Sequence, residues 1–308
     1  MEQKIDNRSL WAWVAAALFA PAAQSLGSAS WPWVLLVASV AGALWLLGAA
    51  ATERGWRCGK AVAAMQILYL IFAVSVAASK SAACWITAKS NWTIPVVLLV
   101  LAATSAAQGN RAGARCGAML YWFVAGMFLL LAAFCLPNVE VNWLRPGVVA
   151  PDGQTAAILL IPAAALLLPR EGKGKAWPWA VAALVLSVTV SVLTIGTLSP
   201  KIAAQTEGAF FETVRGTSIL GVAERFEALV AAAMTLSWFC LLSLFLAAIG
   251  HMAQKIHPAL GKPSIWLSAA IAALVSPYAP VVPAALAAVL AFLLWFLLPA
   301  LGRNKSKS

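Results

Sequence analysis

The sequence predicts an all-α, polytopic membrane protein with about ten transmembrane helices. Hydrophobic residues make up 63% of the 308 residues and charged residues only 10%, whereas a soluble domain carries about 25% charged residues. Apolar runs recur about every 30 residues, and each is long enough, or nearly so, to cross a ~30 Å hydrocarbon core. We therefore expect a single integral membrane domain over residues 1–308.

Charged residues and Gly/Pro clusters separate the apolar runs and define the expected spans. The first run is not followed by a small-residue cleavage site and a soluble domain, so we expect it to remain as the first span. The last two spans have the least defined boundaries. The expected spans lie near residues 10–27, 31–50, 61–79, 92–108, 116–136, 155–169, 176–197, 223–250, 264–280 and 283–301.

Lys and Arg residues concentrate in alternate connections between the spans. Short cytoplasmic loops retain positive charge during insertion, so the distribution predicts an even number of spans with both termini cytoplasmic. The net charge of +11 thus reflects orientation in the lipid bilayer, and no nucleic-acid partner is expected. The basic residues assigned to the outer side are Lys80, Lys89, Arg145, Lys201, Arg215 and Arg225.

Most of the 15 tryptophans lie near the ends of expected spans, as in LWAW (10–13) and WPW (31–33 and 177–179). An amphipathic indole ring favours the headgroup zone. We therefore expect these tryptophans to anchor the helices at the membrane interface.

The motifs of enzymes and metal sites are absent from the sequence. The five cysteines have no CxxC spacing, and His251 and His257 do not pair with them. There is no HExxH, no GxSxG, no phosphate-binding glycine loop and no carboxylate pair inside a span. We expect no enzymatic activity, no catalytic residues, no metal and no cofactor.

Two spans carry an internal proline, namely Pro21 in the first and Pro162 in the short sixth. Each proline either breaks its helix or only kinks it. The two spans lie five apart, which is the spacing of a five-plus-five inverted repeat. We expect repeat one at about 8–136 and repeat two at about 150–301.

Polar residues inside the apolar runs either bond across helices or contact a small polar ligand. With the two prolines, Gln24, Gln66, Tyr69 and Thr235 form the candidate ligand-binding set. The same polar class includes Ser75, Thr93, Tyr121, Thr189, Thr194 and Ser237.

Charged residues open the eighth span in the sequence AERFEALV. Glu224 and Glu227 are three residues apart and share a helix face, while Arg225 points about 100° away from Glu224. They either snorkel to the interface or serve as structural and signalling residues. The external stretch before them (198–221) is expected to hold a short surface helix.

Two segments resemble the spore germination permease family, the B subunits of germinant receptors. The first, 93–146, has a Thr-Pro-like start, a Gly-x-x-x-x-x-Arg connection and a closing Leu-x-Pro; the second, 220–256, has Glu-Arg-x-Glu before an aromatic stretch. The N-terminal IDNRSLWAWV is similar to the family's polar entry to the first span. The matching residues are Thr93, Pro95, Gly109, Arg115, Leu144, Pro146, Glu224, Arg225, Glu227 and Trp238.

The resemblance implies a fold similar to the amino acid/polyamine/organocation (APC) transporters, which is LeuT-like, with unwound first and sixth helices. It implies a membrane subunit that binds a germinant such as an amino acid and signals to an A-type membrane subunit and a C-type lipoprotein. The location would be the spore inner membrane or the cell membrane. The first span departs from the glycine-rich break of working transporters, since it reads FAPAAQSLG.

Two other functions stay open at this point. The same fold would serve a secondary transporter of amino acids or organic cations, although no ion site is apparent in the sequence. A structural membrane subunit without a ligand would use the polar residues of the spans only to pack helices.

Overall fold

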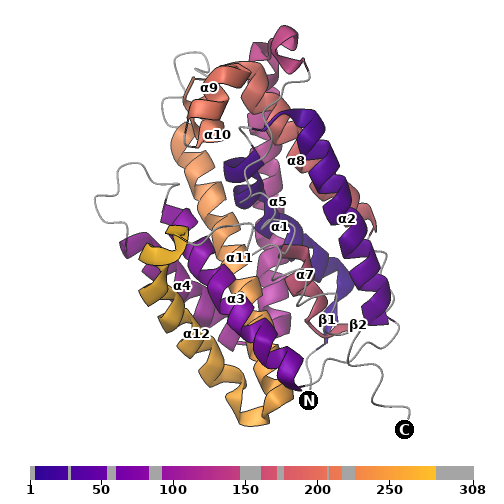
Figure 1. Cartoon of the computed structure of the whole chain (residues 1–308), viewed down its shortest axis with the longest axis vertical. Helices are drawn as coiled ribbons and strands as arrows, with labels where there is room; N and C mark the ends of the chain where they lie inside the picture. The colour runs from indigo at the N-terminus through magenta and orange to yellow at the C-terminus, as the bar shows by residue number, and fades with distance from the viewer. Residues whose placement is uncertain are drawn as a thin grey trace.

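The computed structural model describes residues 4–26, 29–53, 60–82, 92–145, 161–171, 177–206, 208–216 and 226–281. This part of the chain is helical apart from two two-residue strands (Figure 1). The long helices are α1 (Asn7–Leu26), α2 (Trp31–Glu53), α3 (Lys60–Ser81), α4 (Thr93–Ala107), α5 (Asn110–Cys135), α8 (Trp177–Leu198), α11 (Phe226–Ile256) and α12 (Gly261–Val275).

Short elements connect or flank these helices. The strands β1 (Ile5–Asp6) and β2 (Arg170–Glu171) pair in parallel. The short helices are η2 (Leu136–Asn138), η3 (Val141–Leu144), α7 (Ile161–Leu166), α9 (Pro200–Gln205), α10 (Ala209–Gly216), η4 (Pro258–Leu260) and η5 (Ser276–Val281).

Five helical stretches in the described part are long and apolar enough to cross a membrane. Each has 21 to 29 residues, which at 1.5 Å per residue exceeds a ~30 Å hydrocarbon core. The stretches are Lys60–Ser81, Asn110–Asn138, Trp177–Leu198, Ala228–Ile256 and Pro258–Tyr278.

The helix boundaries follow most of the expected spans closely, with three corrections. The expected eighth span ends at residue 250 but α11 continues to Ile256, and in the sixth span, expected to reach residue 169, the described helix α7 ends at Leu166. The expected fifth span begins at residue 116, but α5 begins at Asn110. The extra turns carry Arg111 and Arg115, whose long side chains place their charges in water while the helix continues below them. The expected tenth span, 283–301, lies outside the described residues, as do residues 155–160 of the sixth.

Local chemistry explains where several helices begin. Asp6 precedes α1, and its Oδ2 accepts a hydrogen bond of 3.4 Å from the Ser9 amide, as an N-cap does. Gly109, with a φ of 112°, supplies the left-handed turn between α4 and α5. Pro200 stands in the first turn of α9, where its missing N–H costs nothing. The stretch expected to hold one short surface helix contains two short helices, α9 and α10, and α10 packs against other helices with most of its side chains buried.

Helices α1 and α11 form the centre of the molecule (Figure 1). The most apolar window of α11 is 72% buried inside the protein, against 22% for that of α5. Helix α1 is buried at nearly every position from Leu10 to Ala23. A helix that is apolar on all sides is suited to such a position.

The other helices surround this central pair. Helices α1 and α5 pack together, as do α1 and α11. Helix α2 packs against α8, α3 against α11, and α4 against α12. The β1–β2 pair lies at one end of the molecule, and α9 and α10 lie at the other (Figure 1).

Candidate functional site

The candidate site centres on Pro21, which is buried inside α1. Proline has no N–H, so the Ala17 carbonyl lacks the donor that a helix supplies four residues later, and the ring crowds that carbonyl. Helix α1 nevertheless continues to Leu26. Of the two possibilities for this span, the structure has a helix that passes through its proline without unwinding.

The hydroxyl of Ser237, on α11, is bonded to α1 one turn before Pro21. Its Oγ donates to the Ala16 carbonyl at 2.6 Å and accepts from the Ala20 amide at 2.8 Å. Ala16 and Ala20 are partners across one helical turn, so one side chain bridges both ends of that turn. Ser237 is fully buried, and interhelical bonds of this kind hold membrane helices together.

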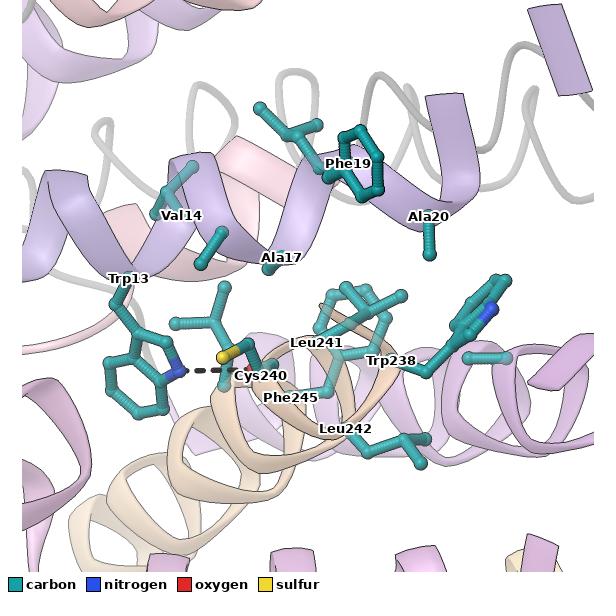
Figure 2. Packing of buried hydrophobic residues seen from close by; sticks show 14 of the residues in the cluster. Trp13, Val14, Ala17, Phe19, Ala20, Trp238, Cys240, Leu241, Leu242 and Phe245 are labelled. Atoms are coloured by element: carbon teal, nitrogen blue, oxygen red, sulfur yellow. Dashed lines mark hydrogen bonds between the residues drawn. The ribbon is translucent and has the colours of Figure 1, made fainter. Parts of the chain in front are cut away.

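A second interhelical hydrogen bond between α1 and α11 lies nearer the start of α1, two turns before Ala20. Trp13 of α1 donates from Nε1 to the Cys240 carbonyl at 3.0 Å, as Figure 2 shows. The same indole lies across Gly113 and Gly117 of α5; an added Cβ would be 3.0 Å from the ring at Gly113 and would collide with it at Gly117. A methyl group on Gly117 would be 2.8 Å from the Trp13 Cβ and closer still to the ring. Trp13 is thus fixed between two helices.

Aromatic contacts enclose α1 on another side. The Phe19 ring meets Phe128 of α5 at 5.4 Å and Phe210 of α10 at 6.2 Å between centroids, both edge to face. Such pairs contribute about 0.5–1.5 kcal/mol beyond area burial. Residues 16–21 of α1 are therefore surrounded by α5, α10 and α11.

Both ends of α1 are also bonded to neighbouring segments. At its start, the Ile5 amide donates to the Pro169 carbonyl at 3.0 Å, and the Arg170 guanidinium stands 5.7 Å from the centre of the Trp11 ring. At its other end, Gln24 Nε2 donates to the Lys80 carbonyl at 3.4 Å. Gln24 therefore joins α1 to the end of α3.

The other candidate residues divide between two helices. Gln66 and Tyr69 are buried on α3, the helix that packs against α11. Thr235 lies on α11 and donates to the Ala231 carbonyl of its own helix at 2.7 Å. This bond lies within α11, and the role of Thr235 as a ligand-binding residue stays a prediction.

Four predicted residues lie wholly or partly outside the described part of the chain. Pro162 belongs to α7, but its side chain is not described; Glu227 belongs to the first turn of α11, and its side chain is likewise not described. Glu224 and Arg225 precede the described part of α11.

Sequence reasoning misplaced several tryptophans and gave too little weight to Ser237. Trp11 and Trp13 were expected at the headgroup level, but each is only 1% exposed. The reason is that α1 lies inside a ring of other helices, so even its ends are covered. Trp33 and Trp177, by contrast, are exposed as expected. The signal for Ser237 was its place beside a tryptophan in the eighth span.

The described residues hold no group of three or more His, Cys, Asp or Glu side chains placed to bind a metal ion. The chemistry that this site offers is hydrogen bonding and apolar contact. It would suit a small ligand with a few polar atoms.

Comparison with solved structures defines the class of protein to which the fold belongs. The chain has a fold similar to that of MhsT and, with five helical stretches long and apolar enough to cross a membrane, is an integral, multi-pass membrane protein. One matching structure is the crystal structure of MhsT in complex with L-phenylalanine, with a TM-score of 0.60 over 98% of this chain and 88% of that chain. Sequence identity is 10%, so the likeness is one of fold alone. No family model and no curated protein matches the chain.

Proposed function

We propose that the chain is the membrane-embedded recognition subunit of a spore germinant receptor. It binds a small germinant such as an amino acid and passes the signal to an A-type membrane subunit and a C-type lipoprotein. The resemblance of residues 93–146 and 220–256 to the germination permeases supports the family. The LeuT/APC fold over nearly the whole chain is compatible with it.

The attachment of α1 to α11 favours a receptor over a transporter. Three hydrogen bonds join the two helices: Trp13 donates to the Cys240 carbonyl, Ser237 donates to the Ala16 carbonyl, and the Ala20 amide donates to Ser237. Alternating access moves one repeat or bundle against the other around the ligand. Helix α1 belongs to repeat one and α11 to repeat two, so these bonds resist such a movement.

The five-plus-five repeat is part of the proposal, with repeats at about 8–136 and 150–301. In an inverted repeat, the helices related by an in-plane two-fold axis meet where they approach that axis. The second, third and fourth spans each pack against the span five places later, as α2 with α8, α3 with α11 and α4 with α12. This pairing supports the repeat.

A secondary transporter is the second candidate function, because the fold itself is that of LeuT/APC transporters. The structure of MhsT holds L-phenylalanine, which makes an amino acid the first ligand to test on this chain. Three interhelical bonds at about 0.6 kcal/mol each sum to about 2 kcal/mol. They slow or disfavour a movement of α1 without forbidding it.

A thermal-shift screen of the purified protein against the twenty amino acids and simple sugars tests ligand recognition. We expect one or a few amino acids to raise the melting temperature. Deleting the gene in the spore-forming host should slow germination in response to the same compounds. A flat thermal response to every compound contradicts the proposal, and so does normal germination of the deletion strain.

A further inference from the structure

Trp238 follows Ser237 on α11 and has a buried donor with nothing to bind. The side chain is 4% exposed, and no acceptor among the described residues pairs with its Nε1. Two other indoles of α1 and α2 are paired: Trp13 donates to the Cys240 carbonyl at 3.0 Å, and Trp31 donates to the Leu144 carbonyl at 2.8 Å. A buried N–H without an acceptor is rare and costs free energy, so Trp238 requires an explanation.

The position of Trp238 gives that explanation. Its indole lies beside Ala20, the residue before Pro21, and Ser237 holds α1 at the same level (Figure 2). Trp238 belongs to the cluster of buried hydrophobic residues, as do Leu241 and Leu242, which follow it on α11. Within the same turn of α1, Pro21 leaves the Ala17 carbonyl without its helical donor. The unpaired Trp238 donor therefore lies at the level of the candidate site.

We propose that Trp238 is a specificity-determining residue of this site, with Nε1 donating a hydrogen bond to a carboxylate oxygen of the ligand. The inference rests on the proposed function and deepens it, since it states which ligand group this chain recognises. A carboxylate is the favoured acceptor because a bond to an ionised oxygen is about twice as strong as one to a neutral oxygen. In an apolar setting an unpaired donor gains most from such a partner.

Replacing Trp238 by Phe removes the N–H and keeps most of the aromatic surface. If the Trp238 N–H binds the ligand and has no partner in the ligand-free protein, the substitution should have opposite effects on stability and on affinity. The melting temperature of the ligand-free protein stays the same or rises, because an unpaired buried donor is gone. Affinity for an amino acid falls tenfold or more, which corresponds to at least about 1.4 kcal/mol. A residue that only packs the core would lower stability and affinity together.

The test compares amino acids with their decarboxylated amines. L-phenylalanine with phenethylamine, and L-leucine with isoamylamine, are titrated into the wild-type protein, Trp238→Phe and Trp266→Phe. Trp266 is a matched control because it lies on α12 and is 44% exposed, away from the site. We expect Trp238→Phe to weaken binding of the amino acid and to leave the amine within twofold, while Trp266→Phe changes neither.

Two outcomes overturn the inference, and they differ from each other. If the wild type binds an amino acid and Trp238→Phe binds it equally well, Trp238 does not contact the carboxylate, although the proposed function stands. If the wild type binds no member of either pair and none of the twenty amino acids, the proposed function fails and the inference fails with it.

Discussion

Replacing Ser237 by Ala should loosen α1 from α11 and destabilise the protein. The change removes the bond to the Ala16 carbonyl and the bond from the Ala20 amide, which are 2.6 Å and 2.8 Å long. Interhelical bonds in membrane proteins average about 0.6 kcal/mol and reach about 1.7 kcal/mol. The expected loss is therefore about 1–3 kcal/mol, and short bond lengths with full burial favour the upper part of that range.

Unfolding of the purified protein in mixed micelles measures this loss, with Ser243→Ala as the matched control. Ser243 is also buried on α11, but its hydroxyl donates to the Cys240 carbonyl of the same helix at 3.0 Å. Hydrogen exchange of peptides covering residues 14–26 measures the local stability of α1, and Ser237→Ala should make this exchange faster. Equal stability of the two variants, with unchanged exchange in α1, would refute the role given to Ser237.

Two further predictions concern the packing of α1 and the orientation of the chain. Gly117→Ala places a methyl group against Trp13 and should lower the free energy of unfolding by about 1–3 kcal/mol. Gly126→Ala meets nothing within 4 Å and should be neutral or stabilising in the same unfolding assay. Equal effects of the two substitutions would contradict the packing of Trp13 against α5. In a cysteine-free background of intact cells, Lys201→Cys should react with an impermeant maleimide and Lys262→Cys should not, because the charge distribution places Lys201 outside and Lys262 inside; the reverse pattern would invert the orientation.

Most of the helical framework could be predicted from hydropathy because each helix must cover the apolar thickness of a bilayer. The second span shows this, since residues 31–50 were expected and α2 covers Trp31–Glu53. The arrangement of the helices was less accessible. Hydropathy is nearly the same on all sides of a membrane helix, so it does not indicate which helix lies at the centre. That is why the burial of Trp11 and Trp13 was missed.

The sequence indicated the candidate site at Pro21 but did not predict which side chains surround it. A proline marks a missing backbone donor, and its place in the span follows from the sequence. Whether the helix unwinds there depends on what packs against it, and the partner is Ser237, more than 200 residues away along the chain. The polar residues Thr235 and Ser237 are two positions apart and look alike in sequence. Their helix faces differ, so one bonds within α11 and the other bonds to α1.

The most direct test of the central claim measures binding and transport on the same preparation. Protein reconstituted in liposomes is given a labelled amino acid that raises its melting temperature in the thermal screen, with and without Na⁺ and proton gradients. A recognition subunit whose α1 is attached to α11 should bind the amino acid and accumulate none of it above protein-free liposomes. Gradient-driven uptake of that amino acid would contradict the account and identify the chain as a transporter.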